Sequence, residues 1–158
     1  DTYQLMSTMR DNGMPLPDAY QAAINFTLHR RFEDLLTDGE GGLLDQPRLD
    51  RLVADFRHWK HKWREAEDLR KAAEDHLYRL VGAAFDNAEN WALVLYLLQA
   101  VENLKLVPNY YRAQNTFLAG WTPLYADSLA ADHLASGLAV ARELRFELGF
   151  VDQEVEVV

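Results

Sequence analysis

The sequence has no cysteine, and this absence excludes several kinds of site. A disulfide, a thiolate zinc site and a cysteine nucleophile all need a side chain that the chain does not contain. The absence does not identify a compartment, because a cysteine-free chain is stable in either redox environment. At 158 residues the chain suits one domain, which can bury a core without covalent cross-links.

Basic residues are in the minority, and long hydrophobic runs are absent. The chain has 16 Lys and Arg against 25 Asp and Glu, so its formal net charge is -9. An acidic surface repels phosphate backbones and anionic lipids, so we expect neither nucleic acid nor a membrane as a partner. The longest apolar run, 91–100, needs about twice its length to cross a bilayer. We therefore expect a soluble, cytoplasmic domain, and the start at Asp1 without a methionine suggests a piece of a longer polypeptide.

Glycine and proline are few, and they gather at 13–17, 39–47, 108 and 120–123. Between these breakers, apolar residues recur every three or four positions, which is the helical spacing. The pattern predicts an all-α fold, a bundle of about five to seven helices, with one domain over 1–149. The tail 150–158 alternates apolar and acidic residues and is expected to be an edge strand or disordered. The expected helices are 2–12, 17–38, 46–82 (unbroken or interrupted near Trp63), 88–105, 110–119, and one from 123 or 127 to 148. The helix 88–105 is apolar nearly all round, which predicts a central position.

Basic and aromatic residues alternate in the segment 56–64, which suits an anionic or planar ligand. On a continuous helix Trp59 and Trp63 would share a face, because they lie four residues apart. His58 and His61 lie three apart, which is a spacing found among metal ligands. The alternative, favoured by the acidic net charge, is a pair of core-facing tryptophans flanked by solvated basic residues. The other histidines, His29, His76 and His133, each stand alone and are expected at the surface or its boundary.

The segment 110–115 combines aromatic rings, a guanidinium and amides within about two helical turns, and Trp121 follows it. Rings that stack on sugar faces and amides that bind hydroxyls are the usual means of holding a carbohydrate. The alternative is a buried polar cluster in which the amides tie neighbouring helices together. The ligand or interface candidates from this segment and its surroundings are Tyr110, Tyr111, Arg112, Gln114, Asn115, Trp121, Trp59 and Trp63.

No complete catalytic motif is present. Carboxylates that could act in pairs on a glycosidic bond are abundant, but most charged pairs on helices are simply solvated. The glycine-rich segment 39–42 lacks the Lys-Ser/Thr that follows a phosphate-binding loop, and no Gly-x-Ser-x-Gly elbow occurs. We therefore predict no catalytic residue and no cofactor, with His58 and His61 as weak metal candidates.

Four short stretches, taken in order, resemble a known family. They are Gly13-Met14-Pro15-Leu16-Pro17-Asp18-Ala19, Ala22-Ala23-Ile24-Asn25-Phe26, the region around Trp59, and Ala113-Gln114-Asn115-Thr116-Phe117. This order is similar to the helical C-terminal domain, of undescribed function, that follows the catalytic domain in certain bacterial glycoside hydrolase family fifty-seven proteins, the α-amylase/α-mannosidase-like group. The resemblance covers about residues 1–120. It implies that the catalytic carboxylates lie in a preceding barrel and that Gln114, Asn115 and Trp59 face its cleft or interface.

Three functions follow as expectations. The first is a non-catalytic accessory domain of a carbohydrate-active enzyme, which packs on a catalytic barrel and completes its cleft. Its partner would be a catalytic domain in the same polypeptide or another protein, with carbohydrate as a further ligand. The second is a stand-alone protein-interaction module whose exposed aromatic residues bind another chain. The third is an independent metal- or ligand-dependent enzyme built around His58 and His61.

Overall fold

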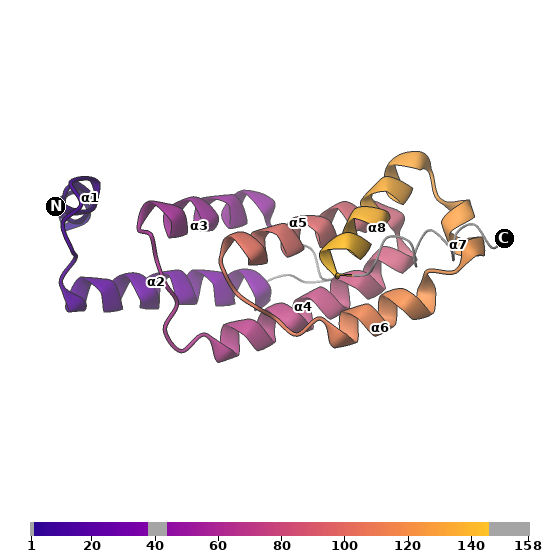
Figure 1. Ribbon diagram of the computed structural model, residues 1–158, viewed down its shortest axis with the longest axis horizontal. Helices are drawn as coiled ribbons and strands as arrows, with labels where there is room; N and C mark the ends of the chain where they lie inside the picture. Colours follow the sequence, from indigo (N-terminus) through magenta and orange to yellow (C-terminus); the bar gives the residue numbers. More distant parts are fainter. Residues whose placement is uncertain (1, 38–43, 146–158) are drawn as a thin grey trace.

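The computed structural model describes residues 2–37 and 44–145, and most of these residues are helical (Figure 1). These ranges contain no strand, which confirms the all-α prediction. They hold eight α-helices and one short 3₁₀ helix: α1 (Thr2–Asp11), α2 (Asp18–Thr37), α3 (Gln46–His58), α4 (Glu67–Asp86), η2 (Ala88–Asn90), α5 (Trp91–Asn103), α6 (Tyr111–Gly120), α7 (Pro123–Ser128) and α8 (Ala131–Glu143). The expected tail 150–158 lies outside the described residues. None of the helices in the described ranges has both the length and the apolar character that crossing a bilayer requires.

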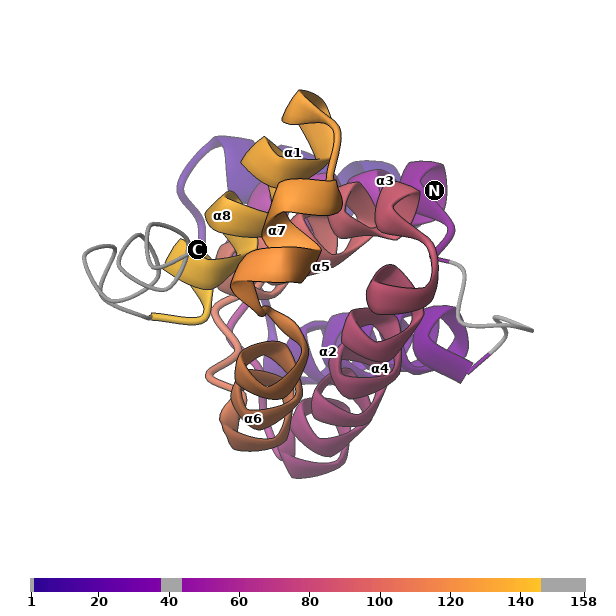
Figure 2. The same ribbon diagram turned by 90° about the vertical axis from the view of Figure 1, so that its right-hand side faces the viewer.

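The helices form two layers. Figures 1 and 2 show α3, α5 and α8 in one layer and α2, α4 and α6 in the other, with α1 at one end and α7 at the opposite end. Helix α5 packs against α3, α4 and α8, and α4 also packs against α2 and α6. The central position expected for the apolar stretch 88–105 is therefore confirmed. Its buried side chains are Trp91, Val94, Leu97, Leu98, Ala100 and Val101.

The stretch 46–82 is interrupted, as one of the two sequence interpretations allowed. Helix α3 ends at His58 with Trp59 as its C-cap, and Lys60 adopts a left-handed backbone conformation with φ 49°. The Lys60 N–H then donates to the Arg57 carbonyl at 3.1 Å and the His61 N–H to the Phe56 carbonyl at 3.0 Å. This is the hydrogen-bond pattern that glycine usually makes at a helix end. The prediction that Trp59 and Trp63 share a helical face is wrong, because the chain is no longer helical at Trp63.

The expected last helix is divided in two. Thr122 caps α7 by accepting a hydrogen bond from the Tyr125 N–H at 3.1 Å, and Pro123 occupies its first turn. Leu129 and Ala130 are extended, with ψ 142° and 156°, so the chain turns before α8 begins. This turn lets α8 pack along α5.

An aromatic cluster fills the end of the core where α4, α5, α6 and α7 meet. The rings of Phe117 and Trp121 stack with centroids 5.0 Å apart and an interplanar angle of 12°. Trp91 meets Trp121 edge-on at 5.7 Å and donates from Nε1 to the Tyr125 hydroxyl at 2.8 Å. Trp121, one of the predicted interface candidates, is only 1% exposed, so it packs the interior here.

Candidate functional site

A row of polar side chains runs along one face of α2. Gln21, Asn25, His29 and Glu33 follow one another at intervals of four residues, which places them above one another on a helix. This polar row of α2 faces the α3–α4 connection and the first turn of α4. The spacing was readable in the sequence, but the residues it contacts were not.

The N-terminal half of the polar row holds the α3–α4 connection in place. Gln21 Oε1 accepts a hydrogen bond from Arg64 Nη2 at 2.8 Å. Asn25 Oδ1 accepts two, from the Arg64 backbone N–H at 3.1 Å and from His61 Nε2 at 3.0 Å. A chain segment without helical hydrogen bonds needs such partners for its polar groups. The side chain of Asn25 is therefore engaged in the fold, although Asn25-Phe26-Thr27 matches a glycosylation sequon.

A pocket of about 320 Å³ opens where this connection meets α1 and α2. Four cationic side chains line it, and no carboxylate does; we call it the basic pocket. The cations are Arg10, Lys60, Lys62 and Arg64. Arg10 reaches over from α1 and donates from Nη2 to the carbonyls of Trp59 and of Lys60, the latter at 3.2 Å. Its Nε is buried and has no hydrogen-bond partner among the described residues.

The pKa of His61, which lines this pocket, is lowered. Burial lowers the pKa of its imidazole to about 4, and the charges of Arg64 and Arg10 contribute to the lowering. Phe56 and Trp63 enclose the ring with edge-on contacts at 5.7 and 5.1 Å. His61 is thus a neutral donor to Asn25 at pH 7, and the surrounding field favours an anion.

The pKa of the buried His76 is lowered as well. His76 is 1% exposed, so the expectation that it lies at the surface is wrong. Its Nδ1 donates to the Leu36 carbonyl at 3.1 Å, and burial and the charge of Arg79 lower the pKa of the imidazole. Like His61, it is held in the neutral form.

Both histidines are expected to make the fold less stable in acid. The folded pKa of each lies below the unfolded value of about 6.5, so below that pH the unfolded chain binds more protons. Stability is fully present above pH 6.5 and falls as the pH drops below it, for His61 down to about pH 4, by up to about 1.4 kcal/mol per pH unit for each histidine. Urea unfolding at a series of pH values measures this slope. His61→Gln keeps a donor for Asn25 and should reduce the slope; an unchanged slope would contradict the assignment.

His58 and His61 have separate partners. His58 is exposed and lies 3.2 Å from the Ser7 hydroxyl, whereas His61 is bound to Asn25. Neither belongs to a group of three metal-ligating side chains in the described part of the chain. The described residues do contain one group of three side chains that could hold a metal ion, but it includes neither His58 nor His61.

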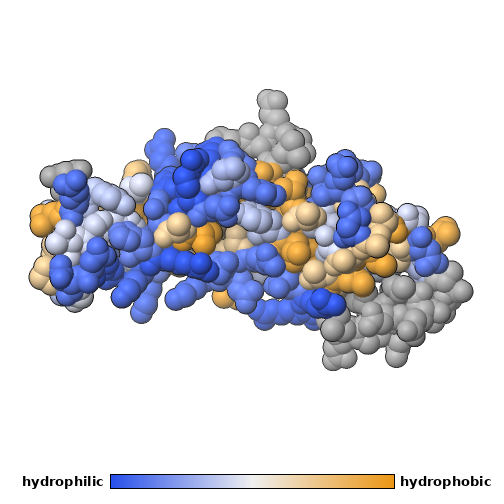
Figure 3. All heavy atoms as spheres, turned by 90° about the horizontal axis from the view of Figure 1, so that it is seen from above, coloured by the Kyte–Doolittle hydropathy of each residue, from blue (hydrophilic) through white to orange (hydrophobic). Residues whose placement is uncertain are grey.

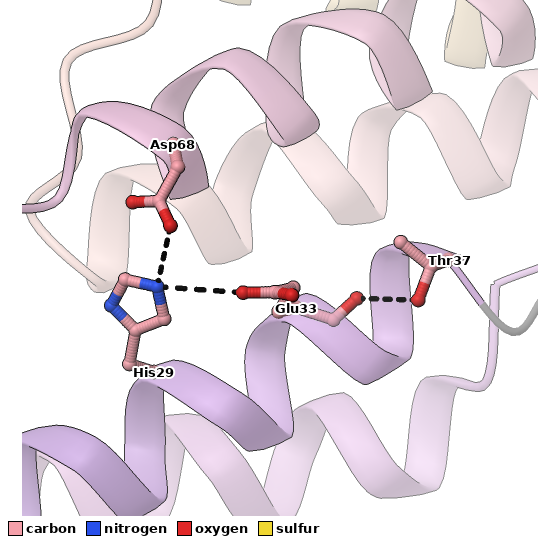
Figure 4. Close-up of polar contacts among 4 residues, drawn as sticks. All are labelled: His29, Glu33, Thr37 and Asp68. Atoms are coloured by element: carbon pink, nitrogen blue, oxygen red, sulfur yellow. Dashed lines mark hydrogen bonds and ion pairs between the residues drawn. The ribbon is translucent and has the colours of Figure 1, made fainter.

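This group lies at the other end of the polar row, around His29 (Figure 4). His29 Nε2 lies 3.0 Å from Asp68 Oδ2 and 3.5 Å from Glu33 Oε2. Burial alone would raise the pKa of Asp68, but the hydrogen bond and charge of His29 outweigh it and lower the pKa. His29, expected to stand alone, is thus the centre of a three-residue cluster.

The segment 110–115 divides between the interior and the surface. Gln114 donates from Nε2 to the Leu144 carbonyl at 2.7 Å, which ties α6 to the end of α8. Tyr110 is half-buried, and burial raises the pKa of its hydroxyl. Arg112 pairs with Asp75 and lies 4.7 Å above the ring of Tyr78. Tyr111, at 66% exposure, and Asn115 point to solvent.

The tryptophan candidates of the segment 56–64 are largely used by the fold. Trp59 is 6% exposed and meets Tyr3 edge-on at 5.4 Å. Trp63 is half-buried, stacks on Phe56 at 5.3 Å and donates from Nε1 to the Leu104 carbonyl at 2.8 Å. Both rings line the basic pocket, but Trp59 is almost fully buried, so of these two Trp63 leaves more of its ring accessible to a sugar.

Glu143 of α8 lies beside Glu102 of α5, and its pKa is raised. Burial raises the pKa of Glu143, and the charge of Glu102 and a hydrogen bond to it raise it further. Glycosidic chemistry needs two carboxyl groups about 5 to 10 Å apart, so that a sugar or water fits between them. Two groups that bond each other directly leave no such room. This pair is therefore a contact between α5 and α8 that lacks the spacing of a glycosidase pair.

Comparison with known proteins yields no match to a protein-family model, to a curated protein or to a solved structure. The resemblance to the family fifty-seven helical domain accordingly stays a prediction.

Proposed function

We propose that this chain is a non-catalytic helical domain that docks onto an acidic surface of a partner domain through the basic pocket. The partner in this proposal is the one that the sequence resemblance implies, the catalytic domain of a carbohydrate-active enzyme in the same polypeptide or on another protein.

The charge of the basic pocket carries the proposal. The protein as a whole has net charge -9, yet Arg10, Lys60, Lys62 and Arg64 converge on one pocket without a lining carboxylate. Among the described residues neither Lys60 nor Lys62 has an ion-pair partner. Like charges brought together without counter-charges are destabilising, and the carboxylates of a partner would relieve that repulsion.

A binding role fits this pocket better than a catalytic one. Its only neutral titratable side chain is His61, which is held by Asn25 and enclosed by two rings. The lining residues include neither a hydroxyl nor a carboxylate that could act with it. A hydrolase site needs at least such a pair, so the described pocket supports recognition of an anion.

The positive charge of the basic pocket marks a docking face more clearly than the exposed apolar side chains do. The exposed large apolar side chains are spread over α1, α2, α4, α6, α7 and two connections between helices, with Leu124 the most exposed at 79%. Figure 3 shows the face above α3 and α8: hydrophilic side chains dominate the half over α3, and hydrophobic ones are more frequent toward α7 and α8. Among the residues that the structure describes, the exposed apolar side chains therefore do not gather on one docking face.

The proposal is tested by titrating the chain with a glutamate-rich peptide and, as a control, a glutamine-rich one. The carboxylates should raise the pKa of His61 and shift the indole resonance of Trp63 in NMR spectra, and added salt should weaken both effects. Lys62→Gln should lower the affinity about two- to fivefold, the range of one partly exposed ion pair. Lys71→Gln, an exposed lysine of α4 outside the pocket, is the matched control. Equal affinities for both peptides would contradict the proposal.

The stand-alone interaction module remains the second candidate, because the same pocket would serve it. Reading the coding sequence that precedes Asp1 separates the two. A catalytic α/β barrel in the same frame supports the accessory role, whereas a start codon directly before Asp1 favours the module.

A further inference from the structure

We infer that His29, Glu33 and Asp68 form a binding site for one divalent transition-metal ion of the zinc class, which would join α2 to the start of α4. This site is separate from the basic pocket and does not depend on the proposed docking function.

Two of the three distances between the ligand atoms, those from His29 to each carboxylate, already match what a shared metal imposes. The three atoms lie within 4.8 Å of one another, with His29 Nε2 at 3.0 Å from Asp68 Oδ2 and 3.5 Å from Glu33 Oε2. Two ligands at about 2.0–2.2 Å from a shared zinc ion lie about 3.0–3.5 Å apart in tetrahedral or octahedral geometry. Figure 4 shows both carboxylates directed at the same imidazole nitrogen. An ion placed between them would replace this hydrogen bond without rearranging the backbone.

The backbone on both sides of the site is fixed. His29 and Glu33 are one helical turn apart on α2, so their side chains project from the same face. Thr37, one turn further, bonds to the Glu33 carbonyl at 2.9 Å. On the other side, the hydrogen bonds from Arg64 to Asn25 and to Gln21 hold the segment that leads into α4. Asp68 is therefore positioned next to His29 by contacts that do not involve the three proposed ligands.

The site is open to an incoming ion, and the charged side chains around its three ligands balance one another. It lies in a depression of about 750 Å³ whose lining also includes the carboxylates of Asp34 and Glu65, as well as Arg30 and Arg64. The side chains of Glu33 and Asp68 are 53% and 66% exposed, and that of His29 is 19% exposed. Three protein ligands leave the remaining coordination positions to water, as in other open zinc sites. One imidazole and two carboxylates suit Zn²⁺, Co²⁺ or Mn²⁺ better than Mg²⁺, which prefers oxygen ligands and its own waters.

The decisive experiment is titration of the chelator-dialysed chain with ZnCl₂ by calorimetry, with CoCl₂ as a spectroscopic probe. We expect one Zn²⁺ per chain, visible absorption bands of bound Co²⁺, and a rise in the melting temperature that EDTA reverses. Absence of Zn²⁺ uptake would overturn the inference.

Variants separate a metal site from a simple ion pair. Glu33→Gln leaves the His29–Asp68 hydrogen bond in place, so the melting temperature without metal should stay unchanged while the Zn²⁺ affinity falls at least tenfold. His29→Gln should abolish binding. His133→Gln is the matched control, because His133 lies 3.9 Å from a single carboxylate, that of Asp132. The His133→Gln variant should therefore bind Zn²⁺ as tightly as the parent protein. Unchanged affinity in Glu33→Gln, or loss of binding in His133→Gln, would show that the ion binds elsewhere. If His29→Gln does not fold, Glu33→Gln decides alone.

Discussion

Replacing Trp121 by alanine is expected to lower the free energy of unfolding by about 3–5 kcal/mol, the range for removing a large buried aromatic side chain. Trp121 is 1% exposed and contacts three other rings, stacking on Phe117 and meeting Trp91 and Tyr125 edge-on. Its Nε1 is buried without a partner among the described residues, so the loss comes from packing and not from a hydrogen bond. The neighbouring rings also hold one another, so they cannot collapse fully into the space left behind.

Urea unfolding followed by circular dichroism at pH 7.5 measures this effect. Leu124→Ala is the control on the adjacent helix α7, because that side chain is 79% exposed and its removal should change stability by less than about 0.5 kcal/mol. A loss below about 1 kcal/mol for Trp121→Ala would mean that Trp121 is not a core residue.

The helices could be predicted from the sequence because apolar spacing and breakers agree over most of the chain. The apolar stretch around Trp91 and Leu97 required a central place, and α5 has it. The ends of the helices were less predictable. Lys60 and Lys105 take left-handed conformations, with φ 49° and 56°, that are typical of glycine. A lysine gives no stop signal in a sequence, so the break after α3 was only an alternative, and α5 was expected to end at 105 whereas it ends at Asn103.

The candidate sites were harder to predict for a related reason. His29 and Glu33 are recognisable as a helical pair from their spacing alone. Their partner Asp68 reaches them only because the chain turns at Lys60 and again at Glu65, where φ is 52°. The basic residues of 56–64 were noted in the sequence, but their convergence on one pocket also depends on Arg10 from α1. Contacts between distant segments cannot be deduced from the local pattern of either segment.

Replacing Gly137 by alanine is expected to destabilise the protein by about 1–3 kcal/mol, although alanine normally strengthens a helix. A Cβ atom at this position of α8 would lie 2.5 Å from Cζ3 of Trp121. That carbon belongs to a rigid ring held between Phe117 and Trp91, so the ring cannot move aside like the end of a flexible side chain. Overpacking should therefore outweigh the gain in helix propensity.

Gly82→Ala provides the matched comparison and should have the opposite sign. Gly82 lies inside α4, and a Cβ there would meet nothing within 4 Å, so alanine should stabilise the protein by about 0.5–1 kcal/mol. Both variants are measured by the same urea unfolding experiment. In a Trp121→Phe background the smaller ring should leave space for the new methyl group, and the cost of Gly137→Ala should fall by about 0.5 kcal/mol or more. The same cost in both backgrounds would show that the penalty does not arise from Trp121, and would place the tight contact of α8 elsewhere in the bundle.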